Sequence, residues 1–291
     1  MADRRLLGIA AAAGLVALAL AAPARAAPAL WAVSDADSTV YLFGSVHVLP
    51  EGGFTVEGAL ADAWRDARTV CLEVDTTALD EVETTRLTLT RAIDPDGRSL
   101  FDLLGPDAED IRKRAAAAGI DLAPYGAFEP WFVSIAITLA ALDQHGFRPD
   151  HGVEEILRQK AAAEGKGGCG LETVDEQLGV LDGFSAGLQR ELLLQSIDEV
   201  ATLDREMSRL VKAWRDGDLR ALGRALDEDM GKYPELAERL VYQRNAHWAD
   251  AIAAMLDGQD DRLVVVGALH LVGEHGLPEL LERRGFRVER R

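Results

Sequence analysis

The stretch Leu-Val-Val-Val-Gly-Ala-Leu-His occupies residues 263–270, and Tyr-Leu-Phe-Gly-Ser-Val-His occupies residues 41–47 near the other end of the chain. Each is an apolar run that ends in Gly-x-x-His, which predicts a buried strand followed by a sharp turn. A helix and another strand are expected after each turn, in units covering residues 39–74 and 262–290. Because neither short unit could bury both faces of its strands alone, we expect the two units to meet in one sheet.

The long segment between these units is predicted to be mostly helical. Residues 131–142 are apolar nearly all round and too few to span a bilayer, which indicates a buried helix. No linker rich in Pro, Gly or Ser divides the chain. The predicted fold class is α/β, with a central mixed β-sheet built from the N- and C-terminal β-GxxH-α-β units, a large helical middle region, and one domain over residues 27–291.

The first 26 residues have the composition of a secretory signal peptide. A short positive start is followed by an Ala- and Leu-rich run at residues 6–22 and by Ala24-Arg25-Ala26, which has small residues at the two positions that a signal peptidase reads. Cleavage after Ala26 predicts a periplasmic or secreted protein with no stable membrane span. The alternative is an uncleaved anchor, since the apolar run is near the lower length limit for crossing a bilayer.

Composition narrows the class of protein further. The chain is 48% hydrophobic and 27% charged, which is sufficient for a core and argues against disorder. Its net charge of −18 makes nucleic acid and anionic membrane surfaces poor partners. Cys71 and Cys169 are too few for a disulfide scaffold; one bridge and two free thiols both remain open. The sequence does not indicate the oligomeric state.

Two histidines are the first candidate site residues. His47 and His270 each follow the C-terminal end of an expected strand, the edge at which open α/β sheets bind ligands. Gly44 and Gly267 would permit the sharp turn or the close approach of a ligand to the backbone. A single histidine in this position is commonly structural, but the repetition of the motif at both ends favours a functional pair.

Two acidic residues interrupt strand-like runs. Glu73 breaks the apolar run at residues 70–74, and Glu172 stands at the corresponding end of residues 168–171. A buried carboxylate requires a partner or a metal ion. The alternative is that both residues only cap the loops or helices that follow.

Arg244 is the most informative residue of the expected late helix. It lies in the middle of an apolar face, and Asn245 lies at the edge of that face. A guanidinium there requires a carboxylate or an anionic substrate group. A structural ion pair with Glu73 or Glu172 and the stabilisation of an oxyanion both remain open. The apolar residues of the face are Leu236, Leu240, Trp248, Ile252 and Met255.

These residues together resemble the TraB/GumN family, which includes the Tiki-type proteases. That family has two Gly-x-x-His motifs near opposite ends of its domain, a Glu on the strand after the first motif, and a late Arg-Asn pair. The matching positions here are Gly44, His47, Glu73, Arg244, Asn245, Gly267 and His270. The family's middle Gly-Val-Asp and Leu-Glu-Thr…Gln pieces correspond to residues 152–154 and 171–177, with Glu154 in place of the usual Asp. The resemblance spans residues 30–290.

The resemblance implies a mixed-sheet α/β fold similar to that of the erythromycin-esterase and ChaN-like proteins, and a metal-dependent hydrolase, with a peptidase as one form of it. His47 and His270 would bind a divalent cation, with Glu73 as a third ligand or as general base for a metal-bound water; this ligand type suits Zn, Mn, Co or Fe. Arg244 and Asn245 would stabilise the oxyanion of a peptide or small-molecule substrate. Two alternatives stay open: a metal-independent esterase-like hydrolase that uses the same His and Glu, and a non-enzymatic binder of haem or another small ligand.

Overall fold

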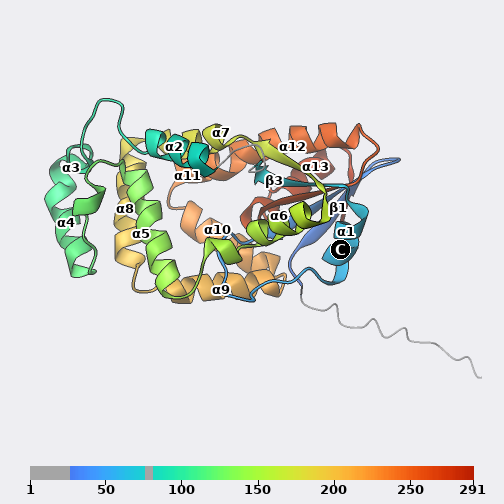
Figure 1. Cartoon of the computed structure of the whole chain (residues 1–291), viewed down its shortest axis with the longest axis horizontal. Helices are drawn as coiled ribbons and strands as arrows, with labels where there is room; N and C mark the ends of the chain where they lie inside the picture. Colours follow the sequence, from blue (N-terminus) through green and yellow to red (C-terminus); the bar gives the residue numbers. More distant parts are fainter. Residues whose placement is uncertain (1–26, 76–80) are drawn as a thin grey trace, which may run out of the picture.

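A mixed six-stranded sheet carries both Gly-x-x-His turns (Figure 1). The computed structural model describes residues 27–75 and 81–291, so the predicted signal peptide at residues 1–26 lies outside the described residues. The strand order is β4-β3-β5-β2-β1-β6. The strands are β1 (Leu30–Ser34), β2 (Thr39–Ser45), β3 (Thr69–Val74), β4 (Gly167–Glu172), β5 (Arg262–Gly267) and β6 (Arg287–Arg290).

Strands from the two ends of the chain pair directly, as the sequence predicted. β2 and β5 run parallel, with Ser45 opposite Gly267, so the two Gly-x-x-His turns leave the sheet side by side. β3 pairs in parallel with β5 and with β4, whereas β1 is antiparallel to both of its neighbours. The C-terminal ends of β4, β3, β5 and β2 therefore lie at one edge of the sheet. The predicted α/β class and the mixed sheet are confirmed.

Most of the helices lie in the part of the sequence between β3 and β5. The capping box at the start of α7, formed by Thr173 and Glu176, and the proline at the first position of α5 are typical helix starts. The helices are α1 (Gly58–Asp66), α2 (Glu81–Arg91), α3 (Leu100–Leu104), α4 (Ala108–Ala117), α5 (Pro130–Gln144), α6 (Val153–Glu164), α7 (Val174–Asp182), α8 (Ala186–Glu199), α9 (Leu203–Arg215), α10 (Leu219–Met230), α11 (Pro234–Ala237), α12 (Gln243–Leu256) and α13 (Leu277–Arg283). Short 3₁₀ turns lie at Gly105–Asp107, Ala123–Tyr125, Pro149–His151 and Ala268–Leu271.

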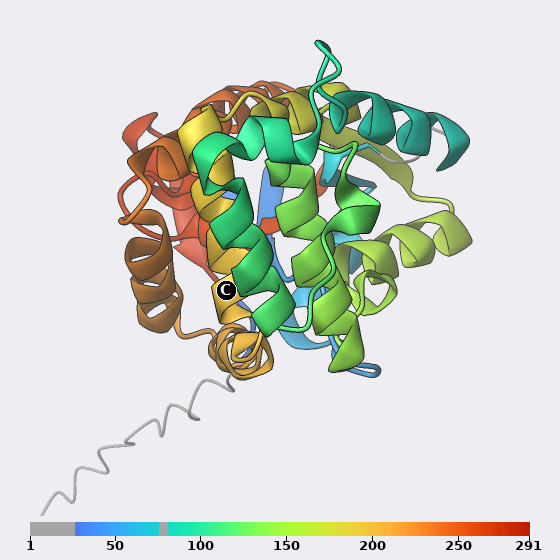
Figure 2. The same cartoon turned by 90° about the vertical axis from the view of Figure 1, so that its left-hand side faces the viewer.

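Helices cover both faces of the sheet. Trp248 and Ile252 of α12 and Leu277 of α13 pack on one face, and helices α1, α6, α9 and α10 pack on the other. A separate apolar core joins α3, α4, α5 and α8 at the end of the molecule away from the sheet. Figure 2 looks onto this helical end, with the green helices in front of the sheet.

Helix α5 differs from the prediction for residues 131–142. The helix is present, but only part of its surface is buried, because Ile135 and Leu139 are 37% and 40% exposed. Packing against α8 covers one side of α5, and the apolar residues of its other side are left towards solvent. In residues 27–75 and 81–291, no helix combines the length and the apolar character needed to cross a membrane.

The two cysteines meet on adjacent strands. Cys71 of β3 lies opposite Cys169 of β4, and their sulfur atoms are joined in a disulfide. Of the two possibilities that the sequence left open, the structure shows the bridge.

Candidate active site

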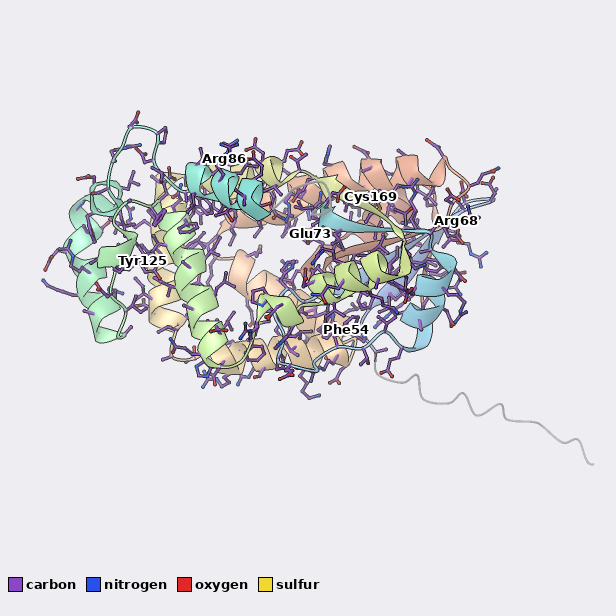
Figure 3. The ribbon with its side chains drawn as sticks, viewed as in Figure 1. Phe54, Arg68, Glu73, Arg86, Tyr125 and Cys169 are labelled. Carbon is purple, nitrogen blue, oxygen red and sulfur yellow. A yellow bond between two sulfur atoms is a disulfide. The ribbon has the colours of Figure 1, made fainter. Side chains whose placement is uncertain are left out.

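Glu73 is the centre of a buried polar cluster at the C-terminal edge of the sheet (Figure 3). Its position near the end of β3 places its carboxylate beside the end of β5, where Oε1 accepts a 2.8 Å hydrogen bond from the backbone N–H of Gly267. Its Oε2 accepts a 2.6 Å bond from Arg244 Nη2. Burial opposes ionisation of Glu73, but the positive charges of His270 (at the low pH where it is protonated), His47 and Arg244, together with the Gly267 N–H, outweigh it and lower the pKa of Glu73. The carboxylate is therefore ionised at neutral pH.

Arg244 joins Glu73 to Glu172. Its Nη2 donates to Glu73 Oε2 and, at 2.7 Å, to Glu172 Oε1, while its Nε donates at 3.2 Å to Glu172 Oε2. Gln177 Nε2 donates to Glu172 Oε1 at 3.2 Å and weakly, at 3.4 Å, to Glu73 Oε2. The guanidinium also lies 4.3 Å from the ring centroid of Trp248. Two buried carboxylates thus share one buried cation.

A π-helical turn, Glu238–Tyr242, precedes α12 and supports Arg244. Leu240 lies within this turn, one helical turn before Arg244, and its carbonyl accepts a 3.0 Å bond from Arg244 Nη1. The other bond of Nη1 goes to His270 Nε2 at 3.2 Å. Arg244 thus makes one hydrogen bond through Nε, two through Nη1 and two through Nη2. A guanidinium has five N–H groups, so every N–H of Arg244 is used inside the protein. In this arrangement Arg244 positions other residues, and a bond to a substrate oxyanion would require one of these bonds to be released.

Asn245 sets the tautomer of His270. Asn245 Nδ2 donates to the carbonyls of His270 and His275, at 3.2 and 2.7 Å, which leaves Asn245 Oδ1 as an acceptor. His270 Nδ1 lies 2.6 Å from this oxygen and therefore carries the proton, while Nε2 accepts from Arg244. Burial lowers the pKa of His270 to about 4, so the ring is neutral at pH 7.

His47 is held by Glu154, which sequence reasoning did not include among the site residues. His47 Nδ1 lies 2.7 Å from Glu154 Oε1, and Ser45 Oγ donates to the same oxygen. The attraction of Glu154 raises the pKa of His47 to about 9, against a smaller opposing effect of partial desolvation of the ring. The His47 side chain is 65% exposed, so solvent screens part of the attraction. His47 and Glu154 line an open cavity of about 370 Å³.

A glycine brings Glu154 to His47. A Cβ atom on Gly152 would lie 2.1 Å from the carbonyl oxygen of His47, so a side chain there would hold α6 away from the turn. Val153 N donates to Val46 O at 3.1 Å across the same contact. The signal in the sequence was the Gly-Val-Glu of residues 152–154, but its spatial partner could not be identified without the fold.

Three side chains of the site, those of His47, Glu73 and His270, approach the same position beside Gly267. A Cβ atom built on Gly267 would lie 3.3 Å from Glu73 Oε1, 3.4 Å from His47 Nε2 and 3.5 Å from His270 Cδ2. Gly44 has a packing role, because a Cβ there would lie 3.2 Å from Ala268 Cα. The structure therefore brings His47, Glu73, Glu172, Arg244, Asn245 and His270 to one edge of the sheet, around Gly267.

A shared metal ion fits the described arrangement only in part. His47 Nε2 and Glu73 Oε1 face the same space, and His270 Nε2 lies 3.9 Å from Glu73 Oε1, within the span of two ligands with bonds of about 2.1 Å each. However, the lone pair of His270 Nε2 already accepts a hydrogen bond from the cationic Arg244. Within the described part of the chain, no three His, Cys, Asp or Glu side chains are grouped as metal ligands. As arranged, the residues do not fit a three-ligand centre.

The chain is similar to one family of known proteins over most of its length. The sequence model of the TraB/PrgY/gumN family matches residues 29–290. The chain is similar to the proteins called "Uncharacterized protein YbaP" of Escherichia coli (strain K12) and of Shigella flexneri, each 28% identical over 152 residues. That match covers 52% of this chain and 55% of the relative, so the chain spans about half the length of the curated relatives it matches. No solved structure matches the chain.

Proposed function

The chain belongs to the TraB/PrgY/gumN family, and on that premise we propose that it is an exported hydrolase of peptides or small-molecule esters. One observation carries the proposal: His47 Nε2 and Glu73 Oε1 face the same space above Gly267, beside an open cavity. The composition of residues 1–26 and the bridged cysteines support export to the periplasm or the medium.

In this proposal Glu73 and His47 form an acid–base pair. Their surroundings lower the pKa of Glu73 and raise that of His47, so that at neutral pH one is an anion and the other a cation. Glu73 Oε1 orients a water molecule and accepts its proton, while His47 Nε2–H donates to the substrate oxygen or to the leaving group. Arg244, Asn245 and His270 hold Glu73 and the shape of the site.

A metal-dependent hydrolase is the second candidate. The 3.9 Å separation of His270 Nε2 and Glu73 Oε1 favours it, provided that Arg244 Nη1 releases His270. His47, Glu73 and His270 would then hold a divalent cation such as Zn, Mn, Co or Fe, which supplies Lewis acidity when bound.

The two candidates are separated by one experiment on residues 27–291. The wild type, His47→Ala and the control His145→Ala, whose side chain is exposed, are incubated with a proteome-derived peptide library and a panel of aryl esters, with and without a chelator. Hydrolysis by the wild type and the control but not by His47→Ala is expected. Activity that survives chelation favours the acid–base pair, and activity that is lost and restored by one metal favours the second candidate. No hydrolysis, with haem or another small ligand co-purifying, would replace the hydrolase with a binding protein.

A further inference from the structure

The disulfide lies close to both carboxylates that hold Arg244. Cys71 and Cys169 are bonded to each other across β3 and β4, two residues before Glu73 and three residues before Glu172. We propose that this disulfide is a positioning element of the site: it fixes β4 against β3 so that Glu172 stays on Arg244, and its reduction releases Glu172. This proposal rests on the contacts of the ion-pair cluster and does not require that the protein be a hydrolase.

Apart from its backbone pairing with β3, strand β4 has few attachments to the rest of the sheet. It is an edge strand whose only partner strand within residues 27–75 and 81–291 is β3. Glycine occupies positions 167, 168 and 170, which removes side-chain packing and increases the conformational freedom that folding must restrict. Leu171 is the one fully buried side chain of the strand, and the first two residues are exposed. The bond at Cys169 is therefore the side-chain restraint that adds to the backbone pairing in the middle of β4.

The Glu172 carboxylate depends on that restraint. It lies at the end of β4, opposite Val74, and accepts two hydrogen bonds from Arg244 and one from Gln177. The side chains of Arg244 and Glu172 are only 7% and 6% exposed. Desolvated charges stabilise each other only in close geometry. Movement of β4 therefore weakens the buried pair of Arg244 and Glu172 more than it would weaken an exposed ion pair.

Glu73 is held independently of the bridge. Strand β3 lies between β4 and β5, and the carboxylate of Glu73 accepts from Gly267 on β5 as well as from Arg244. Breaking the disulfide should therefore leave Glu73 in place and move Glu172. The result is an Arg244 with one carboxylate in place of two.

The bridge can be opened without interference from other thiols. The chain contains only these two cysteines. Cys71 is fully buried, but Cys169 is partly exposed and lines a small cavity with Gly168, Arg158 and Lys166. The thiolate of dithiothreitol attacks the sulfur of Cys169 and expels Cys71 as a thiolate, which leaves a mixed disulfide between dithiothreitol and Cys169. The second thiol of dithiothreitol then attacks the dithiothreitol sulfur of this mixed disulfide and releases Cys169. The products are two cysteine thiols and cyclic oxidised dithiothreitol, so two electrons and two protons pass to the protein.

The test measures the strand and the arginine separately in the mature chain, residues 27–291. Hydrogen exchange followed by mass spectrometry is compared for the oxidised wild type, the wild type reduced with dithiothreitol, and Cys71→Ser/Cys169→Ser. Reaction of Arg244 with phenylglyoxal is followed in the same samples. We expect exchange in residues 167–172 to rise at least tenfold on reduction, with little change in β1 and in α8, and Arg244 to react at least fivefold faster.

Glu172→Gln with the disulfide intact serves as the comparison variant. It should increase the reactivity of Arg244 without raising exchange in β4, and its reduction should increase the reactivity little further, because the bridge acts through Glu172. Unchanged exchange in residues 167–172 would overturn the proposal, as would an equal rise throughout the chain. Fully additive effects of Glu172→Gln and reduction on Arg244 would also overturn it. If the double serine variant does not fold, the reversibly reduced wild type gives the same comparison.

Discussion

At the scale of single residues, the pairing of His47 with Glu154 determines the chemistry of the exposed part of the site. The carboxylate of Glu154 contacts Nδ1, so Nε2 is the nitrogen that faces the space above Gly267. A protonated His47 can donate to a substrate there and loses that ability as the pH rises through its pKa.

The first prediction concerns Glu154→Gln. Removing the negative charge should lower the pKa of His47 from about 9 towards the ordinary value of about 6.5, as measured by an NMR titration of the imidazole. The alkaline limb of the pH–rate profile should move to lower pH with it. Glu155→Gln is the matched control, because Glu155 is on the same helix but pairs with Arg158. A His47 pKa that is the same in the wild type and Glu154→Gln would contradict this assignment.

A second prediction concerns the shared guanidinium. Arg244→Met leaves the buried carboxylates of Glu73 and Glu172 without their cation, which should reduce the free energy of unfolding by about 3–5 kcal/mol. Arg68→Met is the control, because Arg68 is exposed and pairs with exposed Asp260, so a change within about 0.5 kcal/mol is expected. Urea unfolding measures both, and equal effects of the two substitutions would show that burial does not strengthen the Arg244 cluster.

The sequence was sufficient to identify most residues of the site, but not the hydrogen bonds and ion pairs between them. Glu73, Arg244 and His270 could be identified because each is a polar residue in an apolar run or directly after one. The role of Glu154 could not be identified from the sequence, because its partner His47 is distant in sequence and only the fold brings the two residues together. The use of every Arg244 N–H inside the protein was likewise invisible, since it depends on the carbonyl of Leu240 and on the tautomer of His270.

At the scale of elements, the turn after β5 is the part of the site that a single methyl group can test. Gly267 has φ −49° and ψ 135°, which alanine adopts without strain. The methyl group of Gly267→Ala would occupy the space between Glu73 Oε1 and His47 Nε2. We expect hydrolysis to fall by about a hundredfold and the free energy of unfolding to change by about 1 kcal/mol or less.

Gly223→Ala is the control for that substitution. Gly223 lies within α10, and a Cβ there would contact nothing within 4 Å. It should stabilise the protein by about 0.5–1 kcal/mol and leave hydrolysis unchanged. Wild-type rates for Gly267→Ala would mean that the reacting groups do not meet above Gly267.

Elements with a strong local pattern were predictable, and those set by tertiary packing were not. The strands before both Gly-x-x-His turns and the helix at residues 58–66 follow from apolar periodicity and glycine positions. The exposed side of α5 could not be predicted in this way, because an apolar sequence does not show which face of the helix a neighbouring helix will cover. The π-turn at Glu238–Tyr242 also has no local signature, and it widens the helix one turn before Arg244.

At the scale of the whole molecule, the two site histidines have opposite effects on the pH dependence of stability. The folded-state pKa of His270 is lowered to about 4, so between about pH 4 and 6.5 the unfolded chain binds a proton that the folded chain does not. Stability therefore falls as the pH is lowered through this window, by at most about 1.4 kcal/mol per pH unit from this residue. The raised pKa of His47 contributes stability that is complete below about pH 6.5 and is lost as the pH rises towards 9.

These two effects predict a stability maximum near pH 6.5–7. Urea unfolding midpoints between pH 4 and 9 measure it. In His270→Gln, the slope between pH 4 and 6.5 should be smaller than in the wild type, whereas His145→Ala, at an exposed site, should retain it. An unchanged slope in His270→Gln would show that the buried ring is not the group responsible.

At this scale we propose that the two ends of the chain build one hydrolytic site. Its most direct test is the rate of hydrolysis of one substrate, selected with the wild type, by His47→Ala, His270→Ala and the control His145→Ala. Loss of about 10²–10⁴-fold is predicted for His47→Ala, from the N-terminal turn. A similar loss is predicted for His270→Ala, because Arg244 and Glu73 lose their neighbour in the C-terminal turn. A wild-type rate in either variant, with His145→Ala unchanged, would contradict a shared site.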